Sequence, residues 1–320
     1  MNENSTASTL RRHEKYDRLI AAAKSLQPIA TAVAHPCDET SLRGAVEAGE
    51  AGLIKPILVG PKDKIVAVAK QFSLDLGNIE IVDVPHSQAA AEKAVELVRT
   101  GKADLLMKGS LHTDELLSEV MKRETGLRTG RRVSHVFVMD VPGHAQTLFI
   151  TDAAVNIAPD LVSKRDIIQN AIDLFAGLGL GTPKVAILSA VETVTPTIPS
   201  TIEAAALCKM ADRGQITGGE LDGPLAFDNA ISPEAARIKG IKSPVAGLAQ
   251  ILVVPDLEAG NMLAKNLTFL SHADAAGIVL GARVPIILTS RADHVRTRMA
   301  SCAVAALLRH SQMAKQPIRA

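Results

Sequence analysis

The segment with the most reactive side chains is Ser290-Arg291, which follows the apolar run Ile286–Leu288 and precedes Asp293. An arginine guanidinium is suited to bidentate hydrogen bonding with phosphate oxygens. The Ser290 hydroxyl could donate to a developing oxyanion, and the Asp293 carboxylate could accept a proton. The same residues also fit the start of a helix that Ser290 or Asp293 caps, with Arg291 in solvent. The local pattern leaves both interpretations open.

A second candidate segment is Lys108–Thr113, with the sequence KGSLHT. It lies between a predicted strand and a predicted helix, and we expect Thr113 to cap that helix. Free backbone N–H groups at a helix start form a site for an anion, and Lys108 adds a positive charge. An ordinary strand-to-helix turn with Lys108 in solvent is the alternative.

A third candidate segment, PDLEAGN at residues 255–261, opens a predicted helix that carries Lys265. Gly260 would let a ligand approach the backbone closely, although a tight turn with capping acids fits equally well. Two further signals are weaker. Asp152 and Asn156 are spaced by four residues, and the basic run at 128–132 (RTGRR) suits either a phosphate contact or a solvated loop.

The elements that position these residues are short apolar strands. The runs Ile251–Val254, Ile278–Leu280 and Ile286–Leu288 are typical of buried parallel strands, and open α/β sheets bind ligands at strand carboxyl ends. We therefore expect residues 245–291 to form one wall of an active-site cleft. Strands and helices alternate along most of the chain, which predicts an α/β fold with a mostly parallel, doubly wound sheet. Residues 220–227 are expected to be irregular.

Composition excludes several classes of protein. A chain of 320 residues with 47% hydrophobic and 22% charged residues is long enough for two domains and is not of the disordered type. Aromatic residues make up only 2%, and the net charge is +1. There is little surface for stacking bases and no overall field to attract nucleic acid, so we expect no nucleic-acid partner.

No metal site, cofactor motif or membrane segment is predicted. The three cysteines are isolated and the histidines lack metal-ligand spacing, which indicates no metal site and no disulfide framework. Neither GxGxxG after the first strand nor a P-loop is present, which disfavours nicotinamide and ATPase chemistry. With no signal peptide and no apolar stretch of membrane length, we expect a cytoplasmic protein without membrane contact.

Together and in this order, the motifs resemble the phosphate acetyltransferase/phosphate butyryltransferase family. The resemblance covers nearly the whole chain and rests on KGSLHT (108–113), FITDAAVNIAPD (149–160), LDGPLAFDNAI (221–231), SPVAGLAQILVVPDLEAGN (243–261) with Lys265, and TSR (289–291). The chain is more similar to the short, butyryl-like branch. Glu258 stands where the acetyl branch usually has Asn, and Phe269 replaces a basic residue.

The resemblance implies an architecture related to the isocitrate/isopropylmalate dehydrogenases. Two α/β domains, with mostly parallel sheets flanked by helices, would enclose a cleft between them. Domain one would comprise residues 1–148 and 282–320, and domain two would be the inserted segment 149–281. A homodimer is also implied.

The implied reaction converts acyl-CoA and phosphate to acyl phosphate and CoA, with acetyl favoured and butyryl or another short chain possible. CoA would be a substrate, with no bound cofactor and no metal. The implied site residues fall into three groups: catalytic Ser290, Arg291 and Asp293; phosphate-binding Lys108, Ser110, His112, Thr113 and Arg291; and CoA-binding Gly260, Asn261, Lys265 and Arg283.

Two other functions remain as alternatives. One is a metal- and NAD-dependent hydroxy-acid dehydrogenase of the same architecture, which would need clustered Asp ligands that the sequence spacing does not suggest. The other is an inactive acyl-CoA-binding protein, against which the intact Ser290-Arg291 pair weighs.

Overall fold

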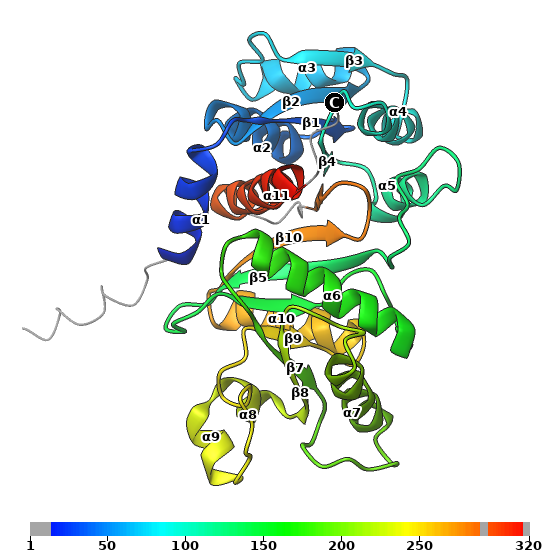
Figure 1. Cartoon of the computed structure of the whole chain (residues 1–320). Coiled ribbons are helices and arrows are strands. Elements are labelled where there is room, and N and C mark those ends of the chain that lie inside the picture. Colours follow the sequence, from blue (N-terminus) through cyan, green and yellow to red (C-terminus); the bar gives the residue numbers. More distant parts are fainter. Residues whose placement is uncertain (1–13, 289–293, 316–320) are drawn as a thin grey trace, which may run out of the picture. The chain divides into compact units, whose positions relative to one another are not determined.

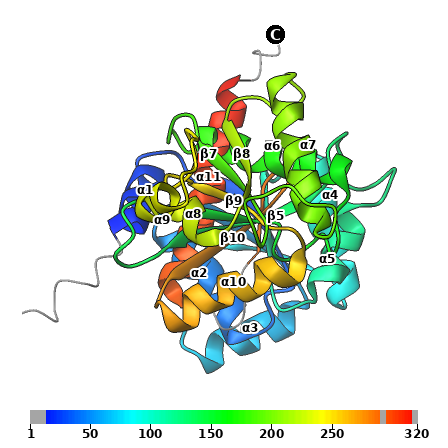
Figure 2. The same ribbon diagram turned by 90° about the horizontal axis from the view of Figure 1, so that it is seen from below.

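A computed structural model describes residues 14–288 and 294–315 of the chain. The chain divides into two compact units (Figure 1), and Figure 2 shows the same ribbon seen from below. We call residues 18–131 with 276–320 the β4 unit, and residues 1–17 with 132–275 the β9 unit. Each unit is a sheet with helices packed on it, so the α/β prediction is confirmed.

The sheet of the β4 unit is built from parallel strands with one antiparallel edge. Its order is β3 (Glu80–Asp83), β2 (Ile54–Gly60), β1 (Ile29–Ala34), β4 (Leu105–Lys108), β11 (Ile286–Ile287) and β10 (Asp274–Leu280). β1 is parallel to β2 and β4, and β11 is parallel to β4. β1, β2 and β4 are buried almost throughout, which explains why they appear in the sequence as continuous apolar runs.

The prediction that all three apolar runs of residues 245–291 are parallel strands is wrong for one of them. β10 pairs with β11 in antiparallel register, Ile278 opposite Ile287. The connection between them, residues 281–285, is far shorter than the dozen or so residues that a parallel crossover needs. The turn at the end of β10 therefore lies at the opposite edge of the sheet from the end of β11.

Two groups of helices pack on the sheet of the β4 unit. α2 (Glu39–Glu50) contacts both α3 (Lys62–Gln71) and α11 (Val295–Lys315), while α4 (Ser87–Arg99) contacts α5 (Thr113–Val120). α11 is joined to the other elements through polar contacts as well. Arg309 pairs with Asp104 at 2.6 Å, and Ser301 accepts a hydrogen bond from the Gly277 amide.

The sheet of the β9 unit has the order β5 (Ser134–Asp140), β6 (Leu148–Thr151), β9 (Ile251–Val253), β7 (Lys184–Leu188) and β8 (Glu220–Leu225). β5 is antiparallel to β6, and the other pairs are parallel. The expectation that residues 220–227 are irregular is wrong, because the ELDGPL segment pairs with β7 along nearly its whole length.

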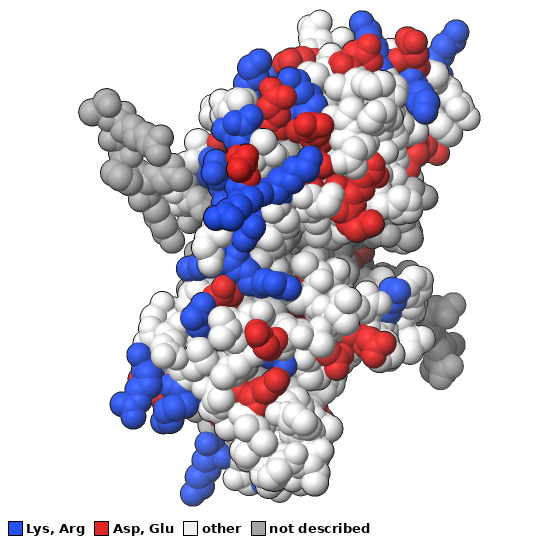
Figure 3. Space-filling model, turned by 90° about the vertical axis from the view of Figure 1, so that its right-hand side faces the viewer, with Lys and Arg blue, Asp and Glu red and all other residues white. Residues whose placement is uncertain are grey.

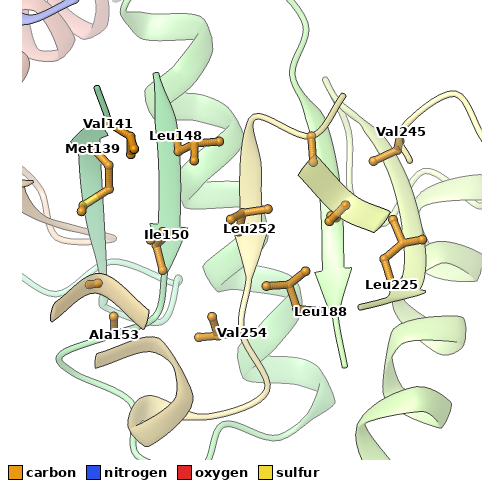
Figure 4. Packing of buried hydrophobic residues seen from close by; sticks show 14 of the residues in the cluster. Met139, Val141, Leu148, Ile150, Ala153, Leu188, Leu225, Val245, Leu252 and Val254 are labelled. Atoms are coloured by element: carbon orange, nitrogen blue, oxygen red, sulfur yellow. The ribbon is translucent and has the colours of Figure 1, made fainter. Parts of the chain in front are cut away.

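Alternation along these strands builds a core on each face of the sheet. One face, shown in Figure 4, carries the cluster that includes Met139, Ile150 and Leu252. α10 (Leu257–Leu270) and the short helices α8 (Phe227–Ile231) and α9 (Pro233–Ile238) contribute to this cluster. On the other face, the Phe149 ring packs against Phe175 of α6 (Leu161–Gly177), beside α7 (Pro199–Asp212).

The helix α1 (Glu14–Lys24) begins with residues that are anchored in the β9 unit. Lys15 is buried and forms an ion pair with buried Asp140 at 2.9 Å. The Tyr16 hydroxyl lies within hydrogen-bond distance of the carbonyl oxygens of Val138 and Asp274. Among the described residues, no helix is both long and apolar enough to cross a membrane.

Candidate active site

The carboxyl ends of three neighbouring strands meet at one edge of the β4 unit. Ala34, the last residue of β1, lies beside Lys108, and Ile287 of β11 lies beside Met107. His35 and Leu288 therefore leave the sheet on either side of the Lys108–Thr113 segment. Thr289, Ser290, Arg291 and Asp293 follow Leu288 in the sequence and lie outside the described residues.

Gly109 allows the chain to pass close to the end of β1. Its amide donates to the Ala34 carbonyl at 2.9 Å, and a Cβ atom at this position would lie only 2.3 Å from that same oxygen. The carbonyl oxygen of His35 would be 2.6 Å away. No side chain fits here, so glycine is required by packing of the chain against itself.

Ser110 and His35 form a local hydrogen-bonded pair. The Ser110 hydroxyl donates to the His35 carbonyl at 2.7 Å and lies 3.0 Å from His35 Nδ1. Ser110 Oγ also accepts a hydrogen bond from the Cys37 amide at 3.3 Å. His35 has a φ of 56°, a left-handed conformation that few non-glycine residues adopt, although His is among the enriched exceptions.

Burial and charge favour the neutral form of the His35 imidazole. Partial burial is the main cause that lowers its pKa below 6.5, and the Lys64 ammonium lowers it further. The carboxylates of Glu115 and Asp38 act in the opposite direction but do not reverse the shift.

Lys108 is a buried cation at the same edge. Only 9% of the residue is exposed, and Nζ donates to the Gly109 carbonyl at 3.2 Å. The alternative interpretation of a solvated lysine is therefore wrong. A positive charge that is held in low-dielectric surroundings acts more strongly on a nearby anion than one in bulk water.

The α5 start differs from the prediction by one residue. The helix begins at Thr113, and the capping position belongs to His112, whose side chain makes no capping hydrogen bond. The prediction of Thr113 as the N-cap is wrong. Asp114 and Glu115 in the first turn are favourable to the helix dipole, and they oppose an anion at this helix start.

Gly260 and Asn261 of the β9 unit lie where α10 packs against the segment that follows β6. A Cβ at Gly260 would lie 2.7 Å from Val254 Cγ2 and 3.0 Å from the Ala153 side chain. The Asn261 side chain donates to the Ala153 carbonyl at 3.2 Å. Lys265, one turn further along α10, is exposed.

A buried network follows β6 in the same unit. The Asp152 carboxylate accepts hydrogen bonds from the amides of Ala154, Val155 and His135, and from both the backbone and the side chain of Asn156. Asn156 Oδ1 in turn accepts from Arg132 Nε at 2.7 Å. The spacing of four residues therefore reflects a loop-forming network. Arg132 and Asn156 line a cavity of about 430 Å³.

Arg283 lies apart from the other candidates of the β4 unit. It is exposed in the turn between β10 and β11, where its amide donates to the Leu127 carbonyl at 2.9 Å. β11 runs parallel to β4. Because Arg283 precedes β11 whereas Lys108 is the last residue of β4, Arg283 and the Lys108–Thr113 segment lie at opposite ends of these strands.

None of the cysteines is an activated nucleophile. Burial raises the pKa of Cys37 to about 11, and that of Cys208 and Cys302 to about 12. Among the residues that the structure describes, no group of three or more His, Cys, Asp or Glu side chains could hold a metal ion.

On the face shown in Figure 3, acidic and basic side chains lie interspersed.

A sequence model of the family described as phosphate acetyl/butaryl transferase matches residues 86–306. The chain belongs to this family. A phosphate acetyltransferase from Rhizobium meliloti is 76% identical over 302 residues, 94% of this chain and 96% of the relative. A phosphate butyryltransferase from Clostridium acetobutylicum is 44% identical over 295 residues, 92% of this chain and 98% of the relative. The prediction of a phosphate acyltransferase is confirmed.

Solved structures agree with this family. A branched-chain phosphotransacylase from Enterococcus faecalis V583 aligns with a TM-score of 0.76 at 32% identity, covering 88% of this chain and 99% of that one. The dehydrogenase-like architecture is confirmed too. A 4-hydroxythreonine-4-phosphate dehydrogenase from Burkholderia phymatum shares the fold at 14% identity, with a TM-score of 0.54 and coverage of 88% and 98%.

Among the candidate residues of this phosphate acyltransferase, the structure brings Lys108 and Ser110 together with His35. His35 was not among the candidates predicted from the sequence, although the His-Pro pair at 35–36 directly follows the apolar run 29–34. The decisive signals, its left-handed backbone and its bond to Ser110, exist only in the folded chain.

Proposed function

We propose that the protein transfers an acyl group between coenzyme A and inorganic phosphate, forming acyl phosphate and free CoA in one direction. One observation carries the proposal beyond family membership. The KGSLHT segment and the strand that leads into Thr289-Ser290-Arg291 end next to each other, since Ile287 pairs with Met107. This arrangement supports a phosphoryl group bound by both segments.

The proposed roles follow the chemistry of the side chains. Arg291 and buried Lys108 would hold the phosphoryl oxygens, with hydrogen bonds from the turn at His112-Thr113. Ser110 would shape this phosphate-binding turn, because its hydroxyl and its amide both donate to the His35 carbonyl. Ser290 would donate to the oxyanion of the tetrahedral intermediate. The family resemblance implies a role in proton transfer for Asp293.

Four residues are proposed to contact coenzyme A: Gly260, Asn261, Lys265 and Arg283. Lys265 is the best supported of them, because it is exposed and no described residue forms an ion pair with it. The packing contacts of Gly260 and the position of Arg283 away from the Lys108–Thr113 segment make these two the weaker members of the group.

The acyl group is proposed to be acetyl, with other short chains as poorer substrates. Support comes from the 76% identity to a relative with an acetyltransferase name, against 44% to one with a butyryltransferase name. We further propose a cytoplasmic homodimer that needs no metal. Met262, Phe269 and Leu270 of α10 are each more than 60% exposed, and burying them against a second copy would stabilise the pair.

The test is phosphate-dependent release of free thiol from acetyl-, propionyl- and butyryl-CoA, without added metal or nicotinamide. Release that requires phosphate supports the reaction class, and the ranking of kcat/KM identifies the acyl group. No release from any of the three, by folded protein, would refute the proposal and favour an acyl-CoA-binding function.

A further inference from the structure

We infer that His35, and not Asp293, is the proton acceptor for the coenzyme A thiol in the direction that forms acyl-CoA. This inference rests on the proposed function and adds to it a residue that the family motifs do not include.

The hydrogen bonds of Ser110 determine the tautomer of His35. A hydroxyl has one hydrogen, and a carbonyl oxygen can only accept, so the 2.7 Å contact to the His35 carbonyl uses the Ser110 proton. The 3.0 Å contact between Ser110 Oγ and Nδ1 must then be a hydrogen bond donated by Nδ1. In the neutral ring, the proton is on Nδ1 and the lone pair is on Nε2.

Nε2 is available to a substrate. Among the described residues it has no hydrogen-bond partner, and it is not a buried atom. The ring is half-buried at the carboxyl end of β1, beside the turn that carries Lys108 and Ser110. A basic nitrogen whose orientation is set by a second hydrogen bond is the usual arrangement of a catalytic imidazole.

The backbone of His35 is also unusual. Holding a histidine at a φ of 56° costs roughly 1–3 kcal/mol, and such residues cluster where the conformation serves a function. Asparagine or glycine would occupy this conformation at lower cost. A neutral imidazole is favoured here because burial and Lys64 lower its pKa, opposed by Glu115 and Asp38.

The step is balanced in atoms and charge. The S–H bond of CoA breaks and its proton moves to Nε2 of His35. The thiolate forms a C–S bond to the acyl carbon, and the C–O bond to phosphate breaks with its electron pair on the leaving oxygen. The proton on Nε2 then passes to the phosphate, which leaves as HPO₄²⁻ and restores the neutral ring.

The test compares His35→Asn with wild type in acyl-CoA formation from acyl phosphate and CoA between pH 5 and 9. The Asn amide can replace Nδ1–H as donor to Ser110 and tolerates a left-handed φ, but it has no counterpart of Nε2. His86→Asn is the matched control, because His86 is the exposed N-cap of α4 and Asn is a favoured capping residue.

We expect His35→Asn to lower kcat/KM by roughly 10²–10⁴, the range for loss of general base catalysis. In wild type, kcat/KM should fall in acid along a limb with a pKa below 6.5. In the variant, the rate should instead rise up to the thiol pKa of about 8.5, and added imidazole should restore activity.

Three results would overturn the inference. The first is that His35→Asn has the same rate and the same pH profile as the wild-type protein. The second is that kcat/KM of the wild-type protein does not fall in acid, a measurement that does not depend on the folding of a variant. The third is full activity in His35→Gln, whose amide accepts no proton. If the wild-type protein is active and any of the three results is found, only the role of His35 is refuted. If the wild-type protein is inactive, the proposed function itself is refuted.

Discussion

Asn156 Nδ2 donates to Asp152 Oδ2 at 2.6 Å, and this contact is the centre of the buried network behind β6. Four further N–H groups point at the same carboxylate, from Ala154, Val155, His135 and the Asn156 backbone. An ionised carboxylate is the only common side chain that can accept from so many donors at once. The network therefore depends on the charge of Asp152, and residues 152–156 are positioned by it.

Asp152→Asn should destabilise the fold. The amide nitrogen of Asn would face N–H groups that now donate to an oxygen, leaving buried donors unsatisfied at a cost of roughly 2–4 kcal/mol. Urea unfolding measures this loss. Asp212→Asn is the control, since Asp212 is an exposed residue that forms a surface ion pair with Lys209, and it should change stability by less than about 0.5 kcal/mol. Equal stabilities of the two variants would contradict the network's importance.

Gly109→Ala should disrupt the junction of β1 and β4. The added methyl would lie 2.3 Å from the Ala34 carbonyl, so the turn that carries Lys108 and Ser110 must move. We expect a loss of at least about 3 kcal/mol in unfolding free energy together with loss of activity. Gly130→Ala is the matched control, because nothing lies within 4 Å of its Cβ position. Thermal unfolding and thiol release on both variants provide the check.

His135 should make the fold less stable in acid. The ring is fully buried in β5 and its Nδ1 has no partner among the described residues. Burial lowers its pKa from 6.5 to about 4, against the opposing effect of Asp152. Between these values the unfolded chain binds a proton that the folded chain does not, so stability falls as pH decreases from 6.5 to 4.

The size of this effect is up to about 3 kcal/mol across the window, at about 1.4 kcal/mol for each unit of the pKa difference. His135→Leu should remove this part of the acid sensitivity and leave stability at pH 7 within about 1.5 kcal/mol of wild type. Guanidinium unfolding at pH 4.5 and 7 distinguishes the two chains. An unchanged difference between the two pH values in the variant would show that His135 is not responsible.

Ser290→Ala should leave the fold intact and slow the chemistry. Loss of one oxyanion donor lowers kcat by roughly 10²–10³. The thermal unfolding midpoint should match wild type while the turnover of acetyl-CoA and phosphate falls by that factor. A near-wild-type kcat would remove Ser290 from the proposed catalytic group.

Much of the fold follows from local pattern. The apolar run Ile29–Ala34 coincides with β1, and the amphipathic segment at residues 161–178 coincides with α6 within one residue, because burial on both faces and a 3.6-residue period leave clear traces in a sequence. β8 was missed because ELDGPL carries no apolar alternation and becomes a strand by pairing with β7. The direction of β10 depended on the short connection to β11, a constraint that was present in the sequence.

The candidate site was predicted only in part. Lys108 and Ser110 were visible as a turn between a strand and a helix, but the burial of Lys108 depends on packing that no local pattern reports. His35 and Ser110 are 75 residues apart and meet only because β1 and β4 are adjacent. Contacts between distant segments are the part of a site that one sequence does not display.

The most direct test of the account is to measure both products of one reaction. Acetyl-CoA and phosphate are incubated with the protein, and free thiol and acyl phosphate are quantified in the same samples. We expect one acyl phosphate for each thiol released, with neither product formed when phosphate is omitted. Thiol release without acyl phosphate, at a rate that does not depend on phosphate, would mean that water is the acceptor and would contradict the proposed transfer.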